Sequence, residues 1–161
     1  MVTSIGAPAV VAVPTERLSG RWKKNNKLSE DTNRLYEYAA LPWFLRKGER
    51  FLRYLEIETN DTQFRRTINA GGFLNVSEVY PWDGSSAKLK RRDMRGGTME
   101  GRVEHTATGA RTLVSWNDPH GLSMEDSFCL SEDGDQLTIY TTAKRPTRDD
   151  HVTIKQVFTK L

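Results

Sequence analysis

The chain has 161 residues, a formal net charge of +3 and a pI of about 9.1, with 37% hydrophobic and 28% charged residues. This length fits one domain with a substantial core, and the composition is that of a globular protein. The longest apolar stretch, residues 5–13, is too short for a membrane span and contains Pro8. The single cysteine, Cys129, excludes an internal disulfide and is typical of a reducing compartment, so we expect a cytoplasmic protein.

The first segment, residues 1–17, contains two prolines and no charged residue before Glu16, so we expect a flexible N-terminal arm. Residues 18–161 instead break into short segments separated by Gly, Asn and Asp, which is typical of an all-β domain. The segments predicted to form strands are Gly20–Lys27, Phe51–Thr59, Thr62–Asn69, Leu74–Tyr80, Ala87–Met94, Met99–Thr106, Arg111–Trp116, Leu122–Leu130, Gln136–Ala143 and His151–Lys160.

Several of these segments alternate apolar and polar residues, which indicates strands with one buried face and one solvated face. In the eighth segment, one face carries Met124 and Phe128 together with the acid Asp126. In the last segment, Gln156 and Phe158 share a face. We therefore expect a few polar groups to point into an otherwise apolar interior.

One region between the first two predicted strands follows a helical pattern. Ser29 is the expected N-cap of a first helix, since acids follow it in the first turn. Pro42 ends that helix and begins a second one, which runs through Trp43 and Phe44 and is closed by Gly48. The sequence therefore predicts two short helices followed by nine strands, without βαβ alternation.

This order of elements is accompanied by four short motifs: Gly20-Arg21-Trp22, the segment 35–47, Ser115-Trp116-Asn117-Asp118 and the segment 156–161. With them, residues 18–161 resemble the intracellular lipid-binding proteins, the fatty-acid-binding and retinoid-binding branch of the calycin superfamily. The resemblance implies an all-β fold, a ten-stranded antiparallel up-and-down barrel with a helix–turn–helix lid between strands 1 and 2. It also implies that Trp22 plugs the barrel floor and that the barrel encloses a hydrophobic small molecule.

The last strand departs from the family pattern. Fatty-acid binders of the family carry Arg-x-Tyr there, which pairs with the ligand carboxylate, whereas this chain has Gln156-Val157-Phe158. Losing charge-assisted bonds to an anion favours a lipid, terpenoid or polyketide-like ligand over a plain fatty acid. An inward-facing Arg66, which shares a face with Phe64, would restore carboxylate binding; the alternative is that Arg66 faces solvent.

The residues expected to contact the ligand lie in the lid or on the inward faces of strands. They are Trp43, Phe44, Phe64, Arg66, Met124, Phe128, Ile139, Gln156 and Phe158. We expect no cofactor and no metal site, because the three histidines and the one cysteine lack the spacing of metal ligands. We also expect a monomer that binds no nucleic acid.

Two further functions stay open. A sealed apolar barrel with a buried acid would suit an isomerase or cyclase, because desolvation raises the pKa of a carboxyl group. Asp126 is the expected catalytic acid, with Glu78 and Glu104 as weaker candidates; the alternative is that Asp126 pairs with an inward arginine. A haem-binding, nitrobindin-like barrel would use His151, although such proteins lack the helical pair.

A basic cluster falls on and after the fifth predicted strand. It consists of Lys88, Lys90, Arg91, Arg92 and Arg95. The preferred interpretation is an edge strand protected from aggregation by charge. The alternative is contact with phosphates or transient contact with an anionic membrane surface.

Overall fold

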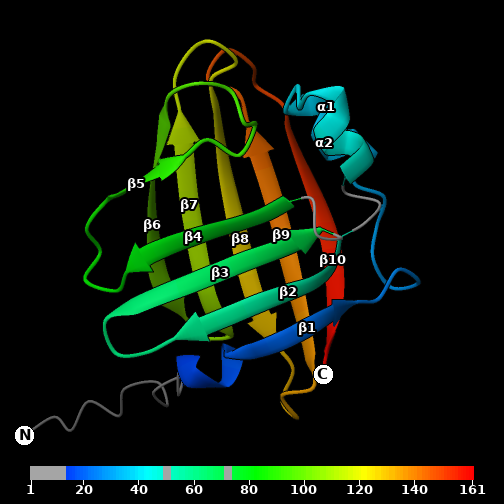
Figure 1. Ribbon diagram of the computed structural model, residues 1–161, viewed down its shortest axis with the longest axis vertical. Coiled ribbons are helices and arrows are strands. Elements are labelled where there is room, and N and C mark those ends of the chain that lie inside the picture. Colours follow the sequence, from blue (N-terminus) through cyan, green and yellow to red (C-terminus); the bar gives the residue numbers. More distant parts are fainter. Residues whose placement is uncertain (1–13, 49–51, 71–73) are drawn as a thin grey trace, which may run out of the picture.

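Ten antiparallel strands form a single curled sheet in the computed structural model, which describes residues 14–48, 52–70 and 74–161. The strand order is β4-β3-β2-β1-β10-β9-β8-β7-β6-β5, and β1–β4 cross over β6–β10 to make a nearly closed barrel (Figure 1). The bounds are Gly20–Lys24 (β1), Leu52–Thr59 (β2), Gln63–Ala70 (β3), Leu74–Pro81 (β4), Ala87–Lys90 (β5), Thr98–Thr106 (β6), Gly109–Trp116 (β7), Leu122–Leu130 (β8), Gln136–Lys144 (β9) and His151–Lys160 (β10). The predicted all-β barrel is confirmed.

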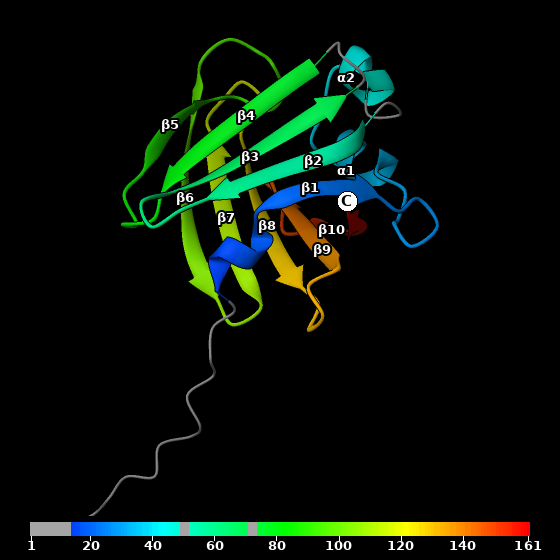
Figure 2. The same ribbon diagram turned by 60° about the horizontal axis from the view of Figure 1, so that its bottom comes forward.

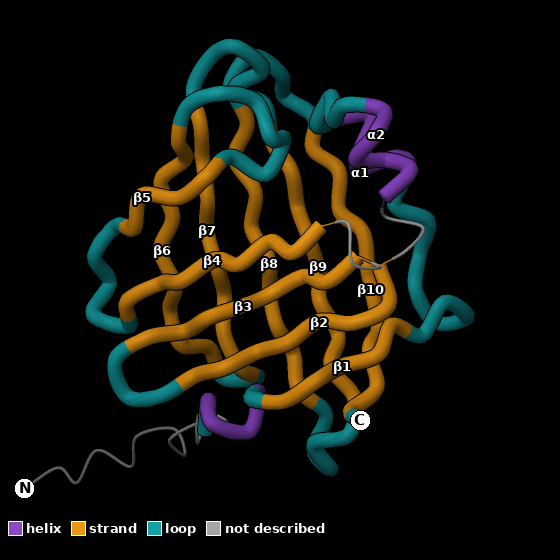
Figure 3. Tube along the Cα trace, viewed as in Figure 1, coloured by secondary structure: helices purple, strands orange, loops and turns teal. Residues whose placement is uncertain are grey.

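A short 3-10 helix, η1 (Thr15–Leu18), closes one end of the barrel (Figures 2 and 3). Leu18 is fully buried, and the indole Nε1 of Trp22 donates to its carbonyl oxygen at 3.0 Å. The predicted boundary between arm and barrel, residues 17 and 18, therefore falls inside η1. Residues 1–13 of the predicted arm lie outside the described residues.

Two helices, α1 (Asn33–Tyr38) and α2 (Trp43–Gly48), lie between β1 and β2 at the opposite end of the barrel (Figure 3). The predicted helix pair is confirmed, but Ser29 as N-cap is wrong, because α1 begins four residues later. The Ser29 hydroxyl instead accepts from the backbone N–H of Val157 at 2.8 Å. Since β1 ends opposite Phe158, Ser29 replaces the missing strand partner of β10.

The first helix is anchored to the turn between β9 and β10. The Tyr38 hydroxyl donates to the carbonyl oxygen of Asp150 at 2.9 Å, and Arg145 Nε donates to the carbonyl oxygen of Tyr38 at 2.9 Å.

Among the described residues, no helix is long and apolar enough to cross a membrane.

The predicted fifth strand is too long, because β5 ends at Lys90. The chain then turns inward, where Arg91 and Asp93 form a buried ion pair at 2.6 Å. Lys88 and Lys90 are exposed at the free edge of the sheet, as the edge-strand interpretation requires. Arg91 is buried and the side chain of Arg92 is 14% exposed, so the basic cluster is not one surface patch.

Side chains close the seam between β4 and β6, near the free edge of β5. The ring of Tyr80 on β4 packs against Gly101 on β6, where a Cβ atom would lie 2.8 Å from Tyr80 Cε1. Next to it, the rings of Trp82 and His105 stack with centroids 3.9 Å apart. Gly101 therefore makes room for the ring that seals the barrel.

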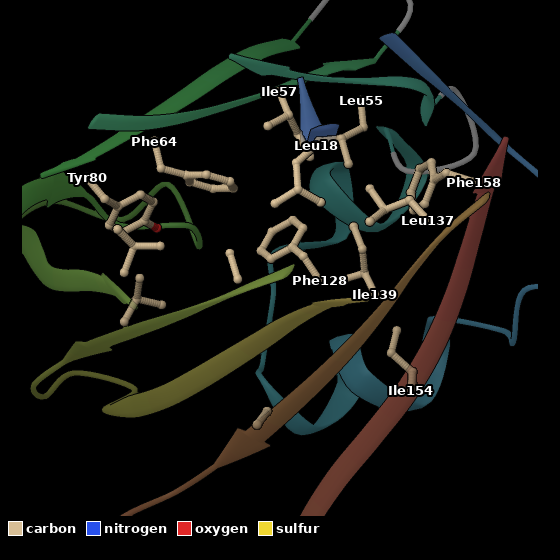
Figure 4. Close-up of a cluster of buried hydrophobic side chains, with 14 of the residues drawn as sticks. Leu18, Leu55, Ile57, Phe64, Tyr80, Phe128, Leu137, Ile139, Ile154 and Phe158 are labelled. Carbon is tan, nitrogen blue, oxygen red and sulfur yellow. The ribbon is translucent and has the colours of Figure 1, made fainter. Parts of the chain in front are cut away.

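Aromatic and aliphatic side chains fill the barrel near η1 (Figure 4). Phe64 and Phe128 are fully buried, with ring centroids 5.4 Å apart, and Leu18, Ile57 and Leu137 surround them. The interior next to η1 is thus packed solid, and space for a ligand lies toward the helix pair.

Candidate ligand-binding site

A cavity of about 160 Å³ lies between the packed core and the helix pair. Its apolar wall includes Leu35 of α1, Leu41 in the link between the helices and Leu45 of α2. Ile68 of β3 and Val76 of β4 continue this wall on the strands. A dry apolar cavity of roughly 150 Å³ is large enough to bind benzene, so this space can enclose an apolar group.

The structure brings five predicted ligand contacts together at this cavity. They are Arg66, Met124, Ile139, Gln156 and Phe158, and the predicted acid Asp126 joins them. They come together because their strands place them on the inward face, as their period-2 pattern predicts.

Four other predicted contacts do not line the cavity. Trp43 and Phe44 lie on the outer side of α2, with 69% and 51% of their surface exposed. Phe64 and Phe128 belong to the packed core near η1 (Figure 4). In α2 the side chain that faces the cavity is Leu45, one position beyond the two aromatic residues.

A cluster of two arginines and two acids forms the polar part of the cavity wall. Arg66 Nη1 lies 2.7 Å from Asp126 Oδ2, and Arg92 Nη1 lies 2.8 Å from the same oxygen. Arg92 also donates from Nη2 and Nε to the two carboxylate oxygens of Glu78, at 2.8 and 2.9 Å. Arg66 is 8% exposed, so of the two orientations that the sequence leaves open for it the inward one is found and the solvent-facing one is wrong.

Neutral hydroxyl groups complete the surroundings of both acids. The Tyr80 hydroxyl donates to Glu78 Oε1 at 2.7 Å, and the Thr141 hydroxyl donates to Asp126 Oδ1 at 2.5 Å. Each carboxylate oxygen therefore has a partner. We call Arg66, Glu78, Arg92 and Asp126 the charge cluster.

The acids of the charge cluster are ionised. Burial raises the pKa of Asp126, but Arg92 and Arg66 outweigh it and lower that pKa to about 2. For Glu78 burial is likewise outweighed by Arg92 and Arg66, and its pKa also falls to about 2. The predicted rise in the pKa of Asp126 is therefore wrong in direction, and the alternative pairing with an inward arginine is found.

Two buried donors in the cavity wall lack a hydrogen-bond partner among the described residues: Arg66 Nε and Gln156 Nε2. A buried donor without a partner costs about 1–3 kcal/mol. Gln156 pairs with Ile139 on β9, one inward position away from Thr141, whose hydroxyl binds Asp126. Gln156 thus lines the cavity from β10, and Arg66 lines it from β3.

The haem hypothesis requires His151 to face the interior of the barrel. His151 is instead an exposed residue at the start of β10, and its position in the alternation places it on the outer face. In the described ranges, no group of three or more His, Cys, Asp or Glu side chains is arranged to hold a metal ion.

Sequence reasoning missed Arg92 and the leucines of the lid. The run of basic residues predicts a surface position for Arg92, whereas this residue follows the end of β5 and its side chain lines the cavity. Glu78 was a weaker catalytic candidate, and its position between Val76 and Tyr80 on one face of β4 was the available signal.

No protein-family model matches the chain, and no curated protein sequence matches it. Solved structures of other proteins do match its fold. The fluorescent protein UnaG is similar with a TM-score of 0.72 and 17% identity, over 92% of this chain and 100% of that one. The zebrafish ileal bile acid-binding protein, solved with cholic acid, has a TM-score of 0.63 and 14% identity, over 90% and 99% of the two chains.

A third similar structure, the REP1-NXSQ fatty acid transporter, has a TM-score of 0.66 and 10% identity, over 89% of this chain and 96% of that one. At these identities the likeness concerns the fold. This chain therefore has the fold of the intracellular lipid-binding proteins, as its resemblance to them implied.

Proposed function

We propose that this chain binds a hydrophobic small molecule inside the barrel and acts as a carrier for it. The observation that carries the proposal is the cavity of about 160 Å³ between the helix pair and the core, with leucines on its lid side. Enclosing apolar ligand surface there yields about 25 cal/mol per Å² removed from water. The names of two similar structures, a bile acid-binding protein and a fatty acid transporter, support the same class of ligand.

The ligand we propose is a lipid, terpenoid or polyketide-like molecule and not a plain fatty acid. A carboxylate needs a free cationic partner in an apolar interior, and the two arginines of the cavity wall already bind two acids. Pockets for drug-sized ligands usually measure about 300–1,000 Å³, so binding a ligand of that size requires the cavity to widen.

Neither alternative function gains an observation in its favour. An isomerase or cyclase would need a proton donor near neutral pH, but the pKa of Asp126 is lowered to about 2.

The single cysteine supports a cytoplasmic location for the proposed carrier, since thiols stay reduced in the cytoplasm.

The test is binding of Nile red, an uncharged environment-sensitive dye, to the wild-type protein and to two variants of β4. Val76→Trp fills the cavity, while Val79→Trp places the same ring on the opposite face of the same strand. We expect blue-shifted fluorescence with the wild type and Val79→Trp, and its loss in Val76→Trp. Equal dye binding by both variants, or no binding by the wild type, would contradict the proposal.

A further inference from the structure

We propose that Asp126 and Glu78 set the ligand selectivity of the barrel, because they occupy both interior arginines and so exclude anionic ligands in favour of uncharged ligands with an acceptor oxygen. A ketone or an ester is the chemical class that fits. This inference rests on the proposed function, since it concerns the ligand of the same cavity.

The charge cluster carries no net charge, because two guanidinium groups face two carboxylates. Three of the four side chains are at least about nine-tenths buried, and the fourth, Arg92, is 14% exposed. A ligand carboxylate would bring a third negative charge into this interior. It would then remain unpaired or displace Asp126 or Glu78 from an arginine, and either outcome is costly in a medium of low dielectric constant.

The hydrogen bonds of Arg92 leave little for an anion. Its Nε and Nη2 atoms bind Glu78, and its Nη1 atom binds Asp126. Arg66 uses Nη1 for Asp126. The bidentate approach through which a guanidinium normally recognises a carboxylate is therefore taken at Arg92 by a residue of the chain itself.

Two buried groups of the cavity wall make no hydrogen bond to the described residues, and both are donors: Arg66 Nε and Gln156 Nε2. Arg66 Nε lies 3.9 Å from Glu78 Oε1, an ion-pair contact that is too long for a hydrogen bond. A carbonyl oxygen has two lone pairs and no proton of its own, so it satisfies donors without adding charge. Binding such a ligand removes the cost of a buried donor without a partner.

A purely structural charge cluster would hold the strands together without sorting ligands by head group. The deciding measurement is therefore a ratio of affinities, which loss of stability alone does not shift. The ligands are dodecan-2-one and dodecanoate, which share a chain length and compete with Nile red at about pH 7.5, where a carboxylate is ionised.

The wild type should bind dodecan-2-one at least about tenfold more tightly than dodecanoate. In Asp126→Asn and in Glu78→Gln the cluster gains one net positive charge, so the ratio should shift toward dodecanoate by about tenfold or more. The matched control is Asp93→Asn, which removes a buried acid paired with Arg91 away from the cavity. This control should leave the ratio at its wild-type value.

Equal or tighter binding of dodecanoate by the wild type overturns the inference, and that comparison needs no variant to fold. An unchanged ratio in Asp126→Asn and Glu78→Gln, with Nile red still bound, also overturns it while leaving the proposed function intact. Absence of Nile red binding in the wild type overturns both together, so the two failures are distinguishable.

Discussion

Acid should destabilise this protein largely through Glu78 and Asp126, the two carboxylates of the charge cluster. Glu78 and Asp126 have pKa values of about 2 in the folded chain, whereas ordinary values are 4.5 and 3.8. A group whose pKa is depressed on folding stabilises the protein above its unfolded pKa, and this stabilisation disappears as the pH falls toward the folded pKa. The window of loss therefore runs from about pH 5 down to about pH 2.

The size of the effect follows from these shifts. At about pH 3, protonation of the unfolded chain removes about 2 kcal/mol of stability through Glu78 and about 1 kcal/mol through Asp126, relative to neutral pH. The two acids share Arg66 and Arg92, so these contributions are coupled. A domain with a typical unfolding free energy of 5–15 kcal/mol, in round numbers about 10, would lose a sizeable part of it.

Urea unfolding monitored by tryptophan fluorescence, repeated between about pH 3 and pH 7, gives the free energy of unfolding at each pH. In Glu78→Gln the loss between those limits should shrink by about 2 kcal/mol, even though the variant is less stable at neutral pH. The matched control is Glu104→Gln, an acid that is 42% exposed and paired with Arg111 on the surface. A Glu78→Gln profile parallel to that of the wild type would refute the assignment of the acid response to the interior.

Three further substitutions test features of the fold. Ala40 follows α1 with a φ of 52°, a left-handed conformation that favours glycine, and the N–H groups of Ala40 and Leu41 bind carbonyl oxygens of the helix end. Ala40→Gly should therefore raise the free energy of unfolding, measured in urea, by about 0.5–1 kcal/mol. Gly101→Ala should lower it by about 1–3 kcal/mol, because the new methyl group meets the Tyr80 ring; an unchanged midpoint would contradict the seam described above. Trp43→Ser should change stability by less than about 0.5 kcal/mol and leave Nile red affinity intact, and weaker dye binding would show that the exposed ring contacts the ligand.

The architecture was predictable because its signals are local. Alternation of apolar and polar residues and the turn residues between segments predicted ten strands, and β8 and β10 begin and end at the predicted residues. The errors lie where a tertiary contact decides the outcome. Ser29 has the sequence features of an N-cap, but the end of β1 leaves the N–H of Val157 in need of an acceptor, and the Ser29 hydroxyl supplies it.

The polar part of the site was predictable only where it sits on a regular strand. Alternation along β3, β8 and β10 placed Arg66, Asp126 and Gln156 on inward faces, and all three line the cavity. Arg92 lies in a turn, where residue spacing does not report direction, and its neighbours Lys88 and Lys90 are exposed. A basic run in the sequence thus separates into surface lysines and a buried arginine only once the turn is known.

The last strand lacks the arginine and the tyrosine that fatty-acid binders of the resembled family carry there. With Gln156 and Phe158 at those positions, β10 contributes no charge to the cavity, and the interior guanidinium groups come from β3 and from the turn after β5. Each of these arginines is matched by an acid on β4 or β8. The barrel therefore keeps cationic side chains in its interior while their charge is already neutralised, and an anionic head group must compete with Asp126 and Glu78 to use them.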